Sequence, residues 1–174
     1  MTRLFTALWP PPPVADALAA DVGDEVPRGW RRTDTATWHV TLAFHGEADP
    51  GVSARRLERS VSGLAAPRLR LAGAGAFEGL RWAGVDCESP LAGLVTATGG
   101  DVARFVAHVT VLRRRPRPGP DPETDPATPW SRHRGSWWRP AEVLLVASEP
   151  GRGGMRYRVV HRVPLRTAET VAGG

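Results

Sequence analysis

The most visible feature of this 174-residue sequence is a set of missing residue types. It contains no Lys, Ile, Asn or Gln, so its 23 basic residues are all Arg, and it has a single cysteine, Cys87. Avoidance of A/T-rich codons explains this bias, so the use of Arg in place of Lys says nothing about mechanism. One cysteine excludes an intrachain disulfide and fits a reducing compartment, and we expect a cytoplasmic protein.

Long apolar runs and several catalytic signatures are also missing. No run approaches the roughly 18 apolar residues of a membrane helix, and proline soon breaks the apolar stretch at the start, unlike a signal peptide. The sequence has no P-loop, no Cys/His spacing typical of a metal site and no Gly-x-Ser-x-Gly motif, so it does not support ATP-dependent, zinc or serine-hydrolase chemistry. We expect no membrane partner, no metal and no other cofactor.

Length and charge set the class of protein. A chain of this length can bury a core as one domain, and its hydrophobic fraction of 41% is that of a globular protein. We expect residues 1–174 to form a single, monomeric domain of two interleaved lobes. The net charge of +5 favours a polyanionic partner, although the sign of the charge alone is weak support.

Apolar periodicity predicts strands alternating with short helices. Helices are expected over residues 14–22, 52–64 and 91–96. Strands are expected over residues 3–9, 37–44, 68–72, 80–85, 105–113, 142–148 and 156–164. Residues 23–32 and the Pro- and Arg-rich residues 114–139 are expected to be loops. This order favours an α+β fold with mainly antiparallel pairing.

Alternation also assigns faces to two of these elements. In the strand over 37–44, the residues expected on the core side are Trp38, Val40, Leu42 and Phe44. Those expected on the opposite side are His39, Thr41, Ala43 and His45. In the helix over 52–64, the residues expected inside are Val52, Leu57, Val61 and Leu64. No packing demand therefore explains His39 and Thr41.

Two copies of a His-x-Thr pattern lie within apolar strands, one in each half of the chain. His39 and Thr41 form the first copy, and His108 and Thr110 form the second. A single copy occurs by chance, and a single strand His is more often structural than catalytic, but two copies in similar contexts are much harder to dismiss. Residues i and i+2 of a strand share a face, so each His projects beside its Thr.

If both strands face one cleft, two imidazoles and two hydroxyls surround a small volume. Imidazole, with an unperturbed pKa of about 6.5, can be neutral or protonated near neutral pH. One His can then take a proton from the attacking hydroxyl or water, and the other can protonate the leaving oxygen of a phosphodiester. The Thr hydroxyls can donate to the phosphate oxygens. This scheme needs no metal and predicts a bell-shaped pH dependence of the rate.

Arg113 follows the second motif and could add charge stabilisation. Under strict alternation Arg113 faces away from His108, so we expect either a bulged strand or a supporting role from behind. Phe77 and Trp82 are expected in the core, with stacking on a base as the alternative. The arginines expected to be solvated, or alternatively to contact RNA phosphates, are Arg114, Arg115, Arg117, Arg132 and Arg134. His133 and His161 are expected to be structural or solvated.

These motifs resemble those of the 2H phosphoesterase superfamily, and within it the RNA 2′,3′-cyclic phosphodiesterases, also called 2′-5′ RNA ligase-like proteins. The resemblance covers nearly the whole chain, from the opening strand at 3–8 through both His-x-Thr motifs, including the trailing Arg113, to the closing hairpin that ends at Pro164. The family usually has Pro before the second His, where this sequence has Ala107.

The resemblance implies a bilobal, LigT-like α+β fold, with two antiparallel sheets related by a pseudo-twofold axis, helices outside and a central cleft. It implies a role in RNA processing, the hydrolysis of a terminal 2′,3′-cyclic phosphate to a 2′-phosphate. His39 would be the general acid for the departing 3′ oxygen and His108 the general base that activates water. RNA ends or cyclic nucleotides would be the substrates. Two alternatives stay open: another cyclic phosphate or 2′,5′-linked oligonucleotide at the same site, and a non-catalytic RNA-binding module.

Overall fold

A computed structural model describes residues 1–115, 128–151 and 154–167 of the chain. The strands are β1 (Thr2–Leu8), β2 (Trp30–Arg32), β3 (Val40–Ala48), β4 (Leu69–Phe77), β5 (Leu80–Cys87), β6 (His108–Arg114), β7 (Glu142–Gly151) and β8 (Gly154–Pro164). The α-helices are α1 (Pro12–Val22), α2 (Pro50–Val61) and α3 (Ala92–Thr98), and the 3-10 helices are η1 (Thr35–Thr37) and η2 (Pro129–Arg132). No helix in these ranges is long and apolar enough to cross a membrane.

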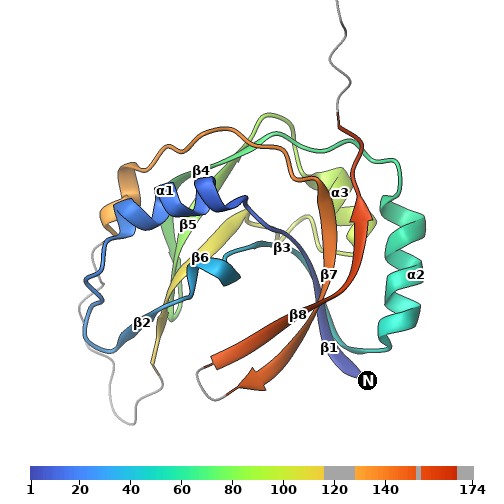
Figure 1. Cartoon of the computed structure of the whole chain (residues 1–174), viewed down its shortest axis with the longest axis horizontal. Coiled ribbons are helices and arrows are strands. Elements are labelled where there is room, and N and C mark those ends of the chain that lie inside the picture. Colours follow the sequence, from blue (N-terminus) through green and yellow to red (C-terminus); the bar gives the residue numbers. More distant parts are fainter. Residues whose placement is uncertain (116–127, 152–153, 168–174) are drawn as a thin grey trace, which may run out of the picture.

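The strands form one sheet that bends into an arch (Figure 1). Its order is β4-β5-β6-β3-β1-β7-β8, with β2 added on β6, and neighbouring strands are antiparallel. In the middle, β3 and β6 share a single register pair, Val40 opposite Val109. The resemblance implied two sheets, but the structure has a single sheet, because this pair joins its two halves. One half has β2, β4, β5 and β6, and the other has β1, β3, β7 and β8. The predicted α+β fold class is confirmed.

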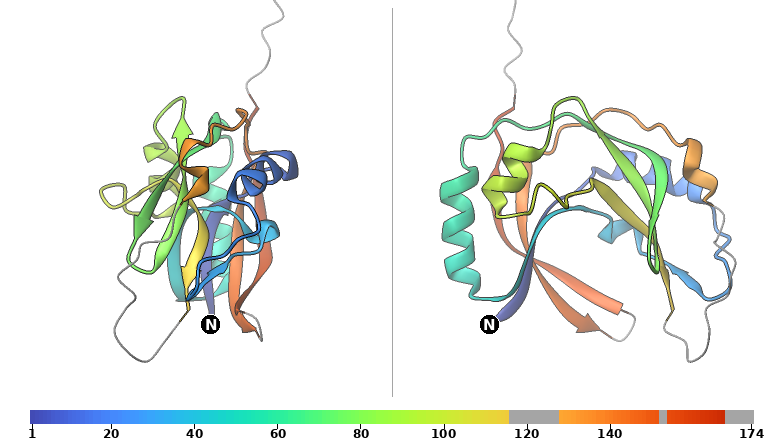
Figure 2. Two further views of the ribbon diagram at one scale, coloured as in Figure 1. Left: turned by 90° about the vertical axis from the view of Figure 1, so that its left-hand side faces the viewer. Right: turned by 180° about the vertical axis from the view of Figure 1, so that it is seen from behind.

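The α-helices lie around the outside of the arch and not within its opening (Figure 2). Helix α2 packs on α3 and on the β7–β8 hairpin at one end, and α1 packs on η1, η2 and β4 at the other. Helix α2 begins where the Asp49 carboxylate accepts from the backbone N–H of Val52 at 2.7 Å, and it buries Leu57 and Val61. One cluster of buried apolar side chains runs through both halves of the sheet, so the halves share a core.

A β-bulge in β3 changes which side chains face that core. Strand β1 pairs with Thr41 and then with Ala43 of β3, so Leu42 is the extra residue. Leu42 and Ala43 are therefore both buried, and Phe44 turns to the other side, where it is 79% exposed. The prediction that Phe44 lies in the core and Ala43 outside is wrong, because the bulge resets the alternation.

An equivalent bulge in β6 turns Arg113. Strand β5 pairs with Thr110 and then with Leu112 of β6, so Val111 is the extra residue. Val111 and Leu112 are both buried, and Arg113 returns to the side of Thr110. Of the two expectations for Arg113, the structure shows the bulged strand. Phe44 and Arg113 thus occupy equivalent positions in the two halves of the sheet.

Other boundaries also differ from the expected ones. The predicted loop over 23–32 ends in the short strand β2, which pairs with β6. Val52, expected inside α2, is 57% exposed, because it lies five residues before Leu57 and hence about 140° around the helix. Of the predicted loop over 114–139, residues 116–127, with Arg117, lie outside the described residues. In its described part, Trp130 and Trp138 are buried.

Candidate active site

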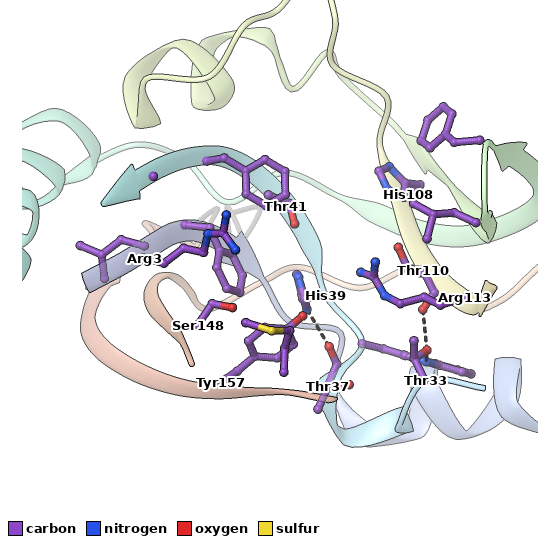
Figure 3. Close-up of a pocket in the computed structure, with 18 residues that line it drawn as sticks. Arg3, Thr33, Thr37, His39, Thr41, His108, Thr110, Arg113, Ser148 and Tyr157 are labelled. Carbon is purple, nitrogen blue, oxygen red and sulfur yellow. Dashed lines mark hydrogen bonds between the residues drawn. The ribbon is translucent and has the colours of Figure 1, made fainter. Parts of the chain in front are cut away.

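Both His-x-Thr motifs open into one cavity of about 650 Å³ (Figure 3). The cavity lies where the halves of the sheet meet, because the residues that follow the two histidines are the paired Val40 and Val109. All five residues singled out for the site line its wall, namely His39, Thr41, His108, Thr110 and Arg113. The structure therefore brings together residues from both halves of the chain.

Each histidine is held by the same backbone contact. Nδ1 of His39 lies 2.6 Å from the carbonyl oxygen of Thr37, and Nδ1 of His108 lies 2.7 Å from that of Val106. A carbonyl oxygen only accepts, so each Nδ1 carries the hydrogen, and Nε2 is the nitrogen left to exchange a proton with a substrate. The two imidazoles are therefore prepared for the same chemistry from equivalent positions.

Aromatic rings surround His39. Trp9 stacks on the imidazole with ring centroids 4.7 Å apart, Phe5 lies at 4.9 Å, and Tyr157 meets it edge-on at 5.3 Å. These rings come from β1, from the residue that follows it, and from β8. They fix the orientation of the imidazole and remove most of its contact with water.

Burial is the main reason why the pKa of His39 falls from 6.5 to about 4. The hydrogen bond to the Thr37 carbonyl opposes this change by favouring the protonated ring. The positive charges of Arg113 and His108 lower the pKa of His39 further. His39 is thus neutral at pH 7.

His108 has its own, smaller aromatic surroundings. Phe77 meets its ring edge-on at 5.1 Å, and Trp82 lies at 5.7 Å. Burial lowers the pKa of His108, the hydrogen bond to the Val106 carbonyl opposes this, and the charge of Arg113 lowers it further. Phe77 lines the cavity and is partly exposed, whereas Trp82 is half-buried beside the imidazole.

Arg113 is the positive group that acts on both histidines. Its charge lowers the pKa of each imidazole, so it lies within electrostatic reach of both. Within the described ranges no carboxylate forms an ion pair with its guanidinium. Because bidentate contacts between Arg and phosphate are strong, Arg113 is suited to hold a phosphate between the two imidazoles.

Several residues of the site carry no signal in the sequence. The Thr33 hydroxyl accepts from the Trp38 indole at 2.7 Å and donates to the carbonyl of Thr110 at 2.7 Å. Thr33 thereby connects the residue before His39 with the strand that carries His108. Arg3 and Tyr157 line the cavity from β1 and β8. Arg3 and Tyr157 come close to the motifs only when the strands pair into the sheet, so no local sequence pattern indicates that they belong to the site.

Two of the other three histidines, His133 and His161, have partners away from the cavity. Nδ1 of His133 lies 2.7 Å from the Asp21 carboxylate, and Nε2 of His161 lies 2.8 Å from that of Glu58. His133 is buried, which fits the structural role expected for it. In the described part of the chain, no group of three or more His, Cys, Asp or Glu side chains is placed to hold a metal ion.

Comparisons with known proteins agree with this fold. A family described as LigT like Phosphoesterase matches residues 8–85, which include the first His-x-Thr motif. The structure of TT0787 of Thermus thermophilus is 28% identical to this chain, with 95% of this chain and 99% of that one covered and a TM-score of 0.71. No curated protein matches the sequence.

Escherichia coli LigT is similar over the same extent. Its structure complexed with phosphate is 25% identical and has a TM-score of 0.67, with 94% of this chain and 97% of that one covered. Its structure complexed with 3′-AMP is 24% identical and has a TM-score of 0.70, with 94% and 98% covered.

The match to the family model covers the first motif, and the structural likeness covers nearly the whole chain. The fold is that of the LigT-like phosphoesterases, and the two comparisons together support the 2H phosphoesterase superfamily as the class of this protein.

Proposed function

We propose that this protein hydrolyses the terminal 2′,3′-cyclic phosphate of RNA to a 2′-phosphate, without a metal ion. The observation that carries the proposal is the meeting of His39, His108 and Arg113 in one cavity, with Nε2 of each imidazole left for proton transfer. A phosphodiester reaction of this kind needs one base, one acid and one positive group.

In the proposed reaction, His108 takes a proton from a water molecule while the water oxygen attacks phosphorus. The bond between phosphorus and O3′ breaks, and His39 gives a proton to O3′, which leaves the phosphate on O2′. His108 ends the step protonated and His39 neutral. His108 then gives its proton to solvent, and His39 takes one from solvent, which restores the starting state of both imidazoles.

Thr41, Thr110 and Arg113 would stabilise the charge that grows on the phosphate oxygens. Each Thr hydroxyl can donate one hydrogen bond, and the guanidinium can donate two in parallel. Phe44 lines the same cavity with most of its ring exposed, and an exposed aromatic face is a surface on which a nucleobase can stack. This combination favours a nucleotide over a bare phosphoester as the substrate.

The lowered pKa values add a condition to the acid role. Because burial and the charge of Arg113 lower the pKa of both histidines, His39 needs a bound anion to hold its proton near neutral pH. A cyclic phosphate diester carries one negative charge, which raises the pKa of nearby imidazoles. We therefore propose that the substrate and the catalytic proton bind together.

The similarity to E. coli LigT supports a phosphate-bearing ligand, since a structure of that protein complexed with phosphate has this fold at 25% identity. Other cyclic phosphates and 2′,5′-linked oligonucleotides would use the same groups. Only a direct comparison of substrates separates them from cyclic-ended RNA.

The test is hydrolysis of cyclic-ended RNA and nucleoside 2′,3′-cyclic phosphates in the presence of EDTA, beside a 2′,5′-linked dinucleotide. We expect a 2′-phosphate product from the cyclic substrates. His39→Ala and His108→Ala should each lower kcat/KM by about 10²- to 10⁴-fold, the usual contribution of a general acid or base. His45→Ala is the control, since His45 does not line the cavity.

Failure to hydrolyse any cyclic phosphate in EDTA, or full activity in both single His variants, would refute the proposal. Faster cleavage of the 2′,5′-linked dinucleotide than of the cyclic substrates would assign a different substrate to the same site. RNA binding that survives both substitutions, with no hydrolysis by the unmodified protein, would point to a non-catalytic binding module.

A further inference from the structure

A second cavity, of about 510 Å³, adjoins the active site next to β2 and the β7–β8 hairpin. Residues from β6 and β8 belong to the walls of both cavities, among them Arg113, Met155 and Tyr157. Four arginines line the second cavity, which we call the arginine subsite: Arg31, Arg32, Arg113 and Arg156.

The charge of the arginine subsite is strongly positive. Asp34 is the one carboxylate among its described lining residues, and it already accepts from the backbone N–H of Ala36 at 2.9 Å. Arg32 donates to the carbonyl of Gly23 at 2.6 Å and lies 3.8 Å from the Asp24 carboxylate. In the described part of the chain, Arg31 and Arg156 form no ion pair.

The guanidinium of Arg31 lies close to the backbone of β8. A Cβ added to Gly154 would lie 2.9 Å from it. Arg31 belongs to β2, which pairs with β6, and Gly154 belongs to β8, which pairs with β7. The guanidinium therefore lies between the two halves of the sheet, in the wall of the cavity that adjoins the active site.

We propose that the arginine subsite binds a second phosphate, the internucleotide phosphate on the 5′ side of the cyclic-ended nucleotide. This inference rests on the proposed function and extends it from a nucleotide to an RNA chain. A single ribose joins the two phosphates, so their sites must be adjacent, as the shared wall at Arg113 makes them. Arginine suits this role because its planar fork matches phosphate oxygens.

The experiment compares three substrates: adenosine 2′,3′-cyclic phosphate, the same nucleotide with a 5′-phosphate, and the dinucleotide ApA with a 2′,3′-cyclic end. We expect kcat/KM for the last two to exceed that of the first by roughly tenfold, mainly through KM, which is the effect of one charge-assisted contact. The preference should shrink as salt is added.

The arginine variants assign this preference to the subsite. Arg31→Ala and Arg156→Ala should lower kcat/KM for the two phosphate-bearing substrates more than for adenosine 2′,3′-cyclic phosphate. Arg59→Ala removes the same charge from the exposed face of α2 and should leave the preference unchanged. A higher kcat/KM for the cyclic-ended ApA alone, without one for the 5′-phosphorylated nucleotide, would assign the preference to the preceding nucleoside and overturn the inference.

The same data separate this inference from the proposed function. If adenosine 2′,3′-cyclic phosphate is hydrolysed but a 5′-phosphate gives no advantage, or one that both arginine variants retain, only the subsite is overturned. If nothing is hydrolysed, the proposed function fails, and calorimetry decides the subsite. Tighter binding of adenosine 3′,5′-bisphosphate than of 3′-AMP, weakened by Arg31→Ala, supports it, and equal binding overturns it.

Discussion

Arg113 and Phe44 occupy equivalent positions after the two bulges, and the difference between them makes the site asymmetric. At this position the half of the site with His108 carries a cation, and the half with His39 carries an exposed aromatic ring. The imidazoles themselves are held alike, each by the carbonyl two residues before it. We therefore expect phosphate binding to depend on Arg113 and binding of the base to depend on Phe44.

Removing the guanidinium tests the first part of this expectation. Arg113→Ala should lower kcat/KM by about 10²- to 10³-fold, as loss of one oxyanion contact does. Arg113→Lys should restore only part of it, because Lys keeps the charge but not the fork. Since Arg113 lowers the pKa of both histidines, the pH–rate profile of Arg113→Ala should move to higher pH. A profile that stays in place, or that moves equally in Arg59→Ala, would contradict this role.

The buried imidazole of His39 should make stability depend on pH. Its pKa is about 4 in the folded protein and 6.5 when unperturbed, so the unfolded chain binds the proton more tightly. The contribution of the buried, neutral His39 to the free energy of unfolding is thus complete above pH 6.5 and is lost as the pH falls toward 4. His39→Phe should flatten the pH dependence of the unfolding free energy in this window, measured by denaturant titration. Identical slopes in the two proteins would exclude the effect.

At the scale of elements, the His-x-Thr pairs could be predicted because the two-residue period of a strand is local. The bulges could not, because Leu42 and Val111 become extra residues only through the register of the neighbouring strands. For this reason alternation alone misplaces Phe44 and leaves the direction of Arg113 open. The family resemblance, more than periodicity, predicts the pairing of the two motifs across one cleft.

Strands β4 and β5 position His108 through a glycine. A Cβ on Gly75 would lie 2.0 Å from the Trp82 ring, which lies beside His108. Gly75→Ala should therefore displace Trp82, lower the unfolding free energy by about 1–3 kcal/mol and reduce kcat. Gly93→Ala in α3, where a Cβ has open space, is the matched control and should be neutral or stabilising. Equal behaviour of the two variants in thermal melts and rate assays would refute this account.

At the scale of the whole molecule, the site depends on how the halves of the sheet are joined. Between β3 and β6 the register holds one pair, Val40 and Val109, and Thr33 adds a hydrogen-bonded link from Trp38 to Thr110. These contacts join residues far apart in the chain, as do the rings of Trp9 and Tyr157 on His39. Composition and periodicity give no information about contacts between distant residues, so these residues could not be predicted to belong to the site from the sequence.

Cutting the link at Thr33 tests this coupling. Thr33→Val keeps the shape of the side chain but leaves the Trp38 indole and the Thr110 carbonyl without this partner, which should cost about 1–3 kcal/mol of stability. Because both motifs lose a shared contact, kcat should fall more than KM changes. Thr33→Ser keeps the hydroxyl and should restore most of kcat. Full activity of Thr33→Val with no loss of stability would show that the link is dispensable.

The central claim is that His39 and His108 act as acid and base on one phosphodiester, and pH–rate profiles in EDTA test it most directly. For the unmodified protein we predict a bell in kcat/KM with its optimum below pH 6.5, because the pKa of both histidines is lowered in the free protein. The residual activity of His39→Ala should lose the basic limb of the bell, and that of His108→Ala the acidic limb. A flat profile between about pH 5 and pH 8, or both limbs retained in either variant, would contradict the claim.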